Sequence, residues 1–258
     1  MNFANEKKEF KKKGYIIVKF KSIEKHIQKI NTKIDLHLKK KNKIKTNPRV
    51  FHYNKSPRIV EAWKNIPEIK KIAYDKNIVK LLKIIKKRDP IPFSSINFLK
   101  GTEQPLHSDY FHFATKPHNY LVGLWIALED IKKDSGPLVI VEKSHKLPII
   151  TNEILNNKIP ENEKQLKKNY TNYENFIKKI IKKNKLKSKE LIIKKGEIIL
   201  WDANTLHGAF KIKNRNLSRK SLVIHYHFSN CKKYYNPLYS LTSKNIYAER
   251  NINKLKIN

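Results

Sequence analysis

The chain has 258 residues, and its 57 Lys and Arg against 22 Asp and Glu give a formal net charge of +35. Hydrophobic residues make up 39% of the sequence, which is enough for a packed core and excludes a wholly disordered chain. There is no run of about 18 apolar residues and no visible secretory signal, so no membrane span is expected. The single cysteine, Cys231, excludes an internal disulfide framework, and a reducing cytoplasm is the expected compartment.

The first third of the chain, residues 1–92, is predicted to be rich in α-helix. A β-rich run over 14–20 is typical of a strand, and isoleucines then recur at helical spacing over 23–34. A run of Lys and Asn over 39–48 is expected to be a surface loop, and a second helical pattern covers 61–87. The sequence Asp-Pro-Ile-Pro that follows is expected to end that helix.

From residue 93 onward the pattern changes to short strands separated by turns. Residues 152–189 interrupt this series with apolar residues at helical spacing, which predicts an amphipathic helix on the outside of the β core. The sequence therefore predicts a mainly β protein with flanking helices. Strands are expected over 94–99, 106–113, 120–128, 138–141, 191–193, 197–201 and 220–228.

The first candidate for chemistry is the pair His107 and Asp109 in the predicted strand 106–113. Side chains i and i+2 of a strand point to the same face, so an imidazole and a carboxylate would lie side by side. His207 follows a predicted strand and a short turn, and it could supply a second imidazole. Two histidines and one carboxylate form the facial triad that holds Fe(II) and leaves three coordination positions open. A surface pair of His107 and Asp109 is the alternative interpretation.

Arg219 lies at the start of the predicted strand 220–228 and is a candidate for binding an organic acid. Its guanidinium group offers a planar fork to a carboxylate such as the distal one of 2-oxoglutarate, and Ser221 shares its face of the strand. Only six of the 57 cations are arginine, so an arginine at this position is unusual for this chain. The alternative is an ordinary surface cation.

Five ordered segments between about residues 94 and 228 resemble the phytanoyl-CoA dioxygenase family of Fe(II)/2-oxoglutarate oxygenases. The segment 141–146 departs from the family pattern, because Glu142-Lys143 replaces a Pro-Gly turn. That turn has a structural role. The segments are 107–113 with the His-x-Asp motif, 124–130 with Trp-Ile-Ala-Leu-Glu-Asp, 134–138 with Asp-Ser-Gly-Pro-Leu, 141–146 with Ser-His-Lys, and 207–221 with His-Gly and Arg-Lys-Ser.

The fold that this resemblance implies is a double-stranded β-helix, a cupin-like jelly roll. It would form a single oxygenase domain over 1–258. Its parts would be an α-rich flank over 1–92, a core over 93–230 that includes the insert 152–189, and a C-terminal extension over 231–258.

The resemblance also implies the roles of individual residues in catalysis and co-substrate binding. Iron would be bound by His107, Asp109 and His207. The co-substrate 2-oxoglutarate would be contacted by Arg219, Ser221, Trp125, Asn97 and Thr205, of which Arg219 would hold the C5 carboxylate. Asp109 fills a position at which halogenating relatives carry a small residue, so hydroxylation is favoured. The implied reaction hydroxylates a small organic molecule with O2 and releases succinate and CO2.

Other histidines and the pocket mouth are assigned lesser roles. His145 matches a structural position of the family and is not expected to bind metal. His225 and His227 are interpreted as core and rim packing in preference to substrate contact. The mouth of the pocket is expected to include Tyr110, His112, the loop 114–120 and parts of the insert 152–189.

The positive charge has two interpretations. Lys, Ile and Asn together are 113 of the 258 residues and have the most A/T-rich codons, so genome bias explains most of the excess. What remains would suit an anionic substrate, and small zwitterions are equally compatible. A nucleic-acid-acting oxygenase is one rival, but position 225, where such enzymes carry a second arginine, is His225. A non-catalytic jelly-roll binding protein is the second rival, and a basic nucleic-acid-binding protein without catalysis is the third. The sequence carries no signal for an oligomeric state.

Overall fold

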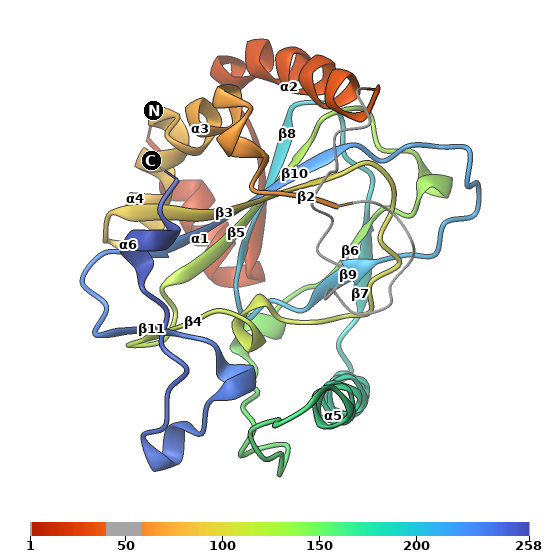
Figure 1. Ribbon diagram of the computed structural model, residues 1–258. Helices are drawn as coiled ribbons and strands as arrows, with labels where there is room; N and C mark the ends of the chain where they lie inside the picture. The colour runs from red at the N-terminus through yellow and green to blue at the C-terminus, as the bar shows by residue number, and fades with distance from the viewer. Residues whose placement is uncertain (1, 40–57, 258) are drawn as a thin grey trace.

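The computed structural model describes residues 2–39 and 58–257, and the loop predicted over 39–48 lies almost wholly outside them. The strands and helices are arranged in layers (Figure 1). The strands are β1 (Tyr15–Lys19), β2 (Arg58–Val60), β3 (Pro90–Phe98), β4 (Ala114–Lys116), β5 (Leu121–Ala127), β6 (Leu138–Val141), β7 (Ser188–Leu191), β8 (Glu197–Asp202), β9 (His207–Ala209), β10 (Ser221–Phe228) and β11 (Lys233–Tyr235). The helices are α1 (Ala4–Lys13), α2 (Lys21–Lys39), α3 (Pro67–Ala73), α4 (Lys76–Lys86), α5 (Glu163–Lys183) and α6 (Ile252–Leu255).

A six-stranded antiparallel sheet in the order β1-β8-β5-β10-β3-β2 forms the centre of the protein. A second sheet in the order β7-β6-β9 has three strands, and β11 pairs with β4 at one end. Strands distant in the chain are neighbours in the large sheet: Ser221 of β10 lies opposite Phe98 of β3 and Ala127 of β5. This register determines which side chains share a face, because directly opposed residues point the same way.

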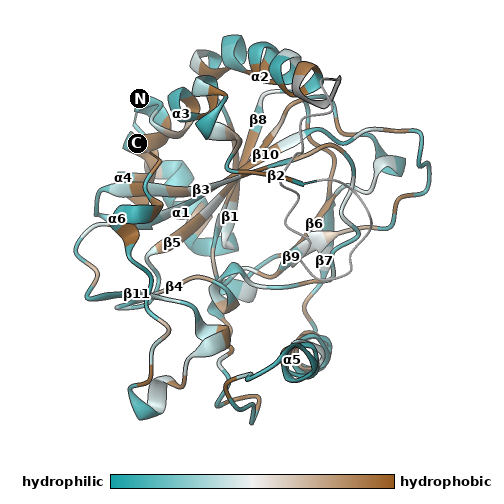
Figure 2. Cartoon of the chain, viewed as in Figure 1, coloured by the Kyte–Doolittle hydropathy of each residue, from teal (hydrophilic) through white to brown (hydrophobic). Residues whose placement is uncertain are grey.

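Helices α1 to α4 cover one face of the large sheet (Figure 1). A buried apolar cluster joins Ile27 of α2, Ile69 of α3 and Leu82 of α4 to Leu222 and Ile224 of β10. The outer sides of these helices are hydrophilic (Figure 2). Burial of this apolar stripe, at roughly 25 cal/mol per Å² of apolar surface, holds the helices on the sheet.

The opposite face of the large sheet meets the three-stranded sheet. Trp125, Ile199 and Val223 of the large sheet form one buried cluster with Ile140 of β6 and Leu191 of β7. Two antiparallel sheets that share a core in this way form the predicted jelly roll.

The helical pattern over 61–87 contains two helices and not one. Pro67 begins α3, where its missing N–H is no loss, and the helix ends at Ala73. Asp75 then caps α4, since its carboxylate accepts hydrogen bonds from the backbone N–H groups of Asn77 and Ile78.

The prolines expected to end the second helix lie inside β3. Pro90 and Pro92 pair with β10 on one side, while β2 on the other side pairs only with Ile96 to Phe98. They therefore occupy a stretch of β3 with an open edge, where a missing N–H is tolerated. The strand predicted over 191–193 lies three residues earlier, as β7.

The helix predicted in the insert is present as α5, at the other end of the molecule from α1 to α4 (Figure 1). Asn162 caps it by accepting a hydrogen bond from the backbone N–H of Gln165. Its Tyr173 stacks on Phe111 with ring centroids 3.9 Å apart, which fixes the helix against the β core. Within the described residues, every helix is too short or too polar to cross a lipid bilayer.

Candidate functional site

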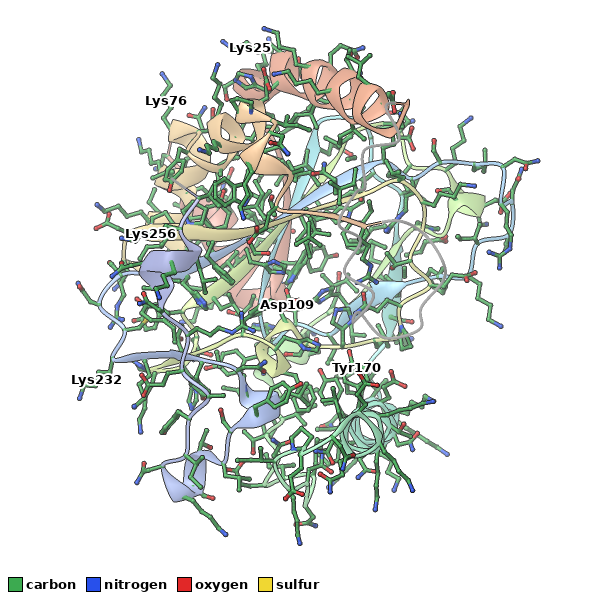
Figure 3. The ribbon with its side chains drawn as sticks, viewed as in Figure 1. Lys25, Lys76, Asp109, Tyr170, Lys232 and Lys256 are labelled. Atoms are coloured by element: carbon green, nitrogen blue, oxygen red, sulfur yellow. The ribbon has the colours of Figure 1, made fainter. Side chains whose placement is uncertain are left out.

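A cavity with a volume of 1120 Å³ opens between the two sheets, and the first turns of α5 border its mouth. Asp109 points into the space where the sheets meet, and Tyr170 of α5 lies below it (Figure 3). Four labelled lysines lie instead at the periphery of the molecule: Lys25, Lys76, Lys232 and Lys256. These four lysines do not line the cavity, whereas Lys164 and Lys167 of α5 do.

The strand predicted over 106–113 is not formed, so the argument that put His107 and Asp109 on one strand face is wrong. Residues Asp109–Phe111 form a 3-10 turn, because the Ser108 hydroxyl accepts a hydrogen bond from the Tyr110 backbone N–H. His107 instead forms a single β-bridge with His207, through N–H···O bonds of 2.8 and 2.9 Å. The bridge and the turn bring the three predicted ligands together without a continuous strand.

His107, Asp109 and His207 each offer one ligand atom, and these atoms all lie within 4.8 Å of one another. The Nδ1 atom of His107 donates to the Pro105 carbonyl at 2.9 Å, and that of His207 donates to the Thr205 carbonyl at 3.0 Å. These bonds place the proton on Nδ1 and leave Nε2 as the acceptor atom of each ring, which is how proteins orient histidines that bind a metal. In His107 that Nε2 atom lies 3.2 Å from the side-chain amide nitrogen of Gln104.

The carboxylate of Asp109 is also held in one orientation. Its Oδ2 atom accepts a hydrogen bond of 2.7 Å from the Trp201 indole N–H, while Oδ1 lies 3.6 Å from His207 Nε2. Gly123 lies beside this indole, and a Cβ atom there would come within 2.4 Å of it. A residue without a side chain at position 123 therefore lets Trp201 hold the carboxylate, leaving Oδ1 for a cation.

The electrostatics of the cluster favour cation binding. Burial lowers the pKa of His107 to about 3, and the neighbouring His207 adds to the effect. Burial by itself would raise the pKa of Asp109, but the charges of His207 and His225 outweigh it and hold this pKa below its usual value. Neutral imidazole and ionised carboxylate are the forms that ligate a metal, and this donor set fits a divalent iron site with open positions.

Arg219 lies in the wall of the same cavity, and 1% of its surface is exposed. Its Nε and Nη1 atoms have no hydrogen-bond partner among the described residues. Burial, with a contribution from the nearby charge of Arg58, lowers its pKa to about 10, so it is cationic at neutral pH. A buried guanidinium group without a counter-ion is costly, and this arrangement is suited to an anionic ligand that enters the cavity.

The sequence model of the phytanoyl-CoA dioxygenase (PhyH) family matches residues 10–221. The chain belongs to this family. Peroxisomal phytanoyl-CoA dioxygenase of Rattus norvegicus is 26% identical over 133 residues, 52% of this chain and 36% of the relative. The enzyme of Homo sapiens is 24% identical over 132 residues, 51% of this chain and 36% of the relative. The chain thus spans about a third of the length of the curated relatives it matches.

Solved structures of other proteins share the jelly-roll fold. The non-heme alpha ketoglutarate dependent carbocyclase SnoK from nogalamycin biosynthesis has a TM-score of 0.68 at 13% identity, covering 96% of this chain and 92% of its own. EctD from S. alaskensis, solved with 2-oxoglutarate and 5-hydroxyectoine, has a TM-score of 0.61 at 16% identity, covering 91% and 79%. The epimerase SnoN, in complex with Fe3+, alpha ketoglutarate and nogalamycin RO, has a TM-score of 0.64 at 15% identity, covering 95% and 92%.

Two of the other co-substrate residues implied by the PhyH resemblance, Trp125 and Ser221, lie near Arg219. Trp125 lines the cavity, with the Arg219 guanidinium 5.8 Å from its ring centroid. Ser221 shares the face of Arg219, and its buried hydroxyl has no hydrogen-bond partner in the part of the chain that is described.

Three of the implied contacts, Ser221, Asn97 and Thr205, do not line the cavity. Asn97 lies opposite Leu222, so it is on the face of the sheet that the helices cover. The Thr205 hydroxyl donates to the Gly14 carbonyl at 2.9 Å, and only its backbone serves the site, by accepting the bond from His207. The resemblance implies contacts by Asn97 and Thr205, but a sequence resemblance does not record on which face a side chain lies.

His225 is the main site residue that the sequence interpretation missed. The sequence predicts a packing role for it, but its Nε2 atom lies 3.4 Å from Asp109 Oδ2 and its ring lines the cavity. The alternation of side chains along a strand indicates this position, because residues 221, 223 and 225 of β10 point to one face and Arg219 precedes them in the same alternation. His227, farther along, stacks on Phe93 at 4.0 Å as packing predicts.

The mouth and upper wall of the cavity add further groups. His112 and the start of α5 line it as predicted, whereas the Tyr110 hydroxyl donates to the Thr115 carbonyl and Tyr110 does not line the cavity. Several polar residues that line it were not predicted from the sequence, among them Arg58, Gln104 and Arg250. His145 lies elsewhere, with Nε2 3.1 Å from the Lys11 carbonyl.

Proposed function

We propose that this chain is an Fe(II)/2-oxoglutarate-dependent dioxygenase that hydroxylates a small organic molecule and releases succinate and CO2. The observation that carries the proposal is the convergence of His107, Asp109 and His207 within 4.8 Å on the wall of a cavity, beside the unpaired Arg219. Iron, when bound, would supply the activation of O2 that is coupled to oxidation of the co-substrate.

The residues of the chain position the reactants and keep water out. Arg219 binds the distal carboxylate of 2-oxoglutarate through charge-assisted hydrogen bonds, and Trp125 forms a flat wall beside it. The Ser221 hydroxyl is the additional donor on that side. Trp201 holds Asp109 so that one carboxylate oxygen faces the metal position. These groups are preorganised, since their rings and backbone partners are already in place.

The proposed substrate is a small molecule that carries an anionic group. The cavity volume of 1120 Å³ accommodates such a molecule together with the co-substrate. Arginines from the N-terminal flank and from the C-terminal segment both line it, which supports a single oxygenase domain built from the whole chain. A cytoplasmic location is proposed from the single cysteine, although the curated relatives carry the word peroxisomal in their names.

Anaerobic titration with Fe(II) and 2-oxoglutarate tests the assignment. Wild-type protein is expected to develop the weak visible charge-transfer band of a metal-bound 2-oxo acid, and Asp109→Ala is expected to lack it. His145→Ala is the matched control, because this histidine lies outside the cluster. A band that is absent from wild type, or equal in Asp109→Ala, would falsify the enzyme proposal and leave a non-catalytic binding protein. Consumption of 2-oxoglutarate and a gain of one oxygen atom in the product then test hydroxylation.

A further inference from the structure

Arginine is concentrated in the cavity although lysine dominates the chain. The sequence has 51 lysines and six arginines, yet three of those arginines line the cavity: Arg58, Arg219 and Arg250. Guanidinium groups bind carboxylate and phosphoryl groups in a bidentate manner, whereas lysine acts as a point charge. Arg219 is already assigned to the co-substrate, so the other two need a separate explanation.

Arg250 is held in place by the C-terminal segment, beyond the residues 10–221 that the family model matches. Its backbone N–H donates to the Tyr234 carbonyl at 2.7 Å, and the preceding Glu249 forms a β-bridge with Tyr235. Farther on, the buried Ile257 donates its N–H to the Pro92 carbonyl at 3.2 Å. The segment is thus anchored on both sides of Arg250, which gives the arginine a defined position.

The guanidinium group of Arg250 lies 4.7 Å from the centroid of the Phe113 ring. Its Nε atom is buried, and no described residue accepts a hydrogen bond from it. The ion pairs of the described residues include none to Arg250, and burial lowers its pKa from the ordinary value without a compensating carboxylate. Like Arg219, this side chain is a cation prepared for a ligand that the protein itself does not provide.

A short series of contacts connects Arg250 to the metal ligands. The Phe113 ring lies 5.3 Å from the His225 ring, and His225 Nε2 lies 3.4 Å from Asp109 Oδ2. Arg219 lies just before the start of β10, and His225 is six residues farther along the chain, about 20 Å at ~3.3 Å per residue. The co-substrate held by Arg219 therefore leaves Arg250 free for a second molecule.

We infer that Arg250 binds the anionic group of the substrate, a carboxylate or a phosphoryl group, and that the Phe113 ring supports the adjoining carbon skeleton. The inference rests on the proposed function for the identity of this molecule as a substrate. It assigns specificity to one partly buried arginine of the C-terminal segment and not to the surface lysines. The geometry also gives the orientation of the substrate, since a molecule bound at Arg250 extends over Phe113 toward Asp109.

Calorimetric titration of three probes with the same three-carbon chain tests this site: butyrate, propylphosphonate and butyramide. The protein is loaded anaerobically with Fe(II) and saturating 2-oxoglutarate, so that Arg219 is occupied. Wild type is expected to bind at least one anion about tenfold or more tightly than the neutral butyramide. Arg250→Gln is expected to lose that preference while keeping its affinity for 2-oxoglutarate, and Arg250→Lys is expected to fall between the two.

Arg215→Gln is the matched control, because Arg215 is exposed and lies outside the cavity. Tighter binding of propylphosphonate assigns the site to phosphoryl groups, and tighter binding of butyrate assigns it to carboxylates. Three results overturn the inference: no anion binding by wild type, equal binding of butyramide, or unchanged anion binding by Arg250→Gln. The inference is also overturned if Arg58→Gln loses the preference for anionic probes while Arg250→Gln keeps it. Failure of the proposed function is read separately, as absence of the charge-transfer band before any probe is added.

Discussion

The two faces of β10 show how one strand serves stability on one side and chemistry on the other. Leu222, Ile224 and Phe228 are fully buried against the helices on the outer face. The single polar side chain among them, Tyr226, donates its hydroxyl to the Ala73 carbonyl at 2.9 Å. The outer face therefore contains apolar contacts and a satisfied hydrogen bond.

The inner face of the same strand has the opposite character. Arg219, Ser221 and His225 are equally buried, yet each has polar atoms without a hydrogen-bond partner among the described residues. Buried polar atoms without partners cost stability. Their concentration on one face is the arrangement that the proposed ligand site requires, while the outer face supplies the packing that compensates for their cost.

The largest effect is expected from removing a ligand of the inner face. His207→Ala removes one of three donors and leaves the remaining two too few to hold iron, so Fe(II) binding and turnover should be abolished. The thermal midpoint of the metal-free protein should change little. Calorimetry with Fe(II) measures the first effect and circular dichroism the second, and a variant that still binds iron at wild-type affinity would contradict the ligand set.

A substitution in the core on the outer face should lower stability and leave Fe(II) binding unchanged. Ile224→Ala leaves a void against the helices and is expected to lower the free energy of unfolding by about 2–5 kcal/mol. Fe(II) affinity of the folded fraction should be unchanged. Urea unfolding measures the loss, and Val223→Ala on the inner face is the control, expected to lose less because Val223 borders an existing cavity. Equal losses would remove the distinction between the faces.

Arg219→Gln should change stability and co-substrate binding in opposite directions. Removing the buried unpaired charge is expected to raise the thermal midpoint of the metal-free protein. The affinity for 2-oxoglutarate should fall at least about tenfold, because charge-assisted hydrogen bonds of about 1.5–3 kcal/mol are lost. Thermal melts and calorimetric titration of 2-oxoglutarate measure the two changes. A lower midpoint together with unchanged affinity would show that Arg219 is structural.

The smallest expected effect is a pH-dependent change in stability from an ion pair between two helices on the outer face. The hydrogen bond from Lys33 of α2 is the largest cause that lowers the pKa of Glu68 in α3. A folded pKa below the unfolded value contributes stability at neutral pH that is lost as pH falls through the folded pKa. Glu68→Gln should therefore melt below wild type at pH 7, with the gap closing as pH falls below about 4. Glu61→Gln, in an exposed pair, should show no such gap.

Much of the site could be predicted because its signals are local in the chain. His107 and Asp109 are two residues apart, and His207 and Arg219 each lie next to a predicted strand, in places that the family pattern also indicates. The helix of the insert followed from its spacing, and α5 lies where an outer amphipathic helix was expected. The alternation of side chains along β10 also indicates that His225 faces the cavity, since His225 is on the same side as Arg219.

The sequence by itself determined the ligand types, the alternating strands and the amphipathic helices, because these depend on neighbours a few residues apart. Only the tertiary structure decided that Asp109 lies in a 3-10 turn and that Asn97 faces the helices. It also decided that Arg250, from the end of the chain, reaches the cavity. The physical reason is that strand register and chain anchoring join segments far apart in sequence, and no local pattern records which of them will meet.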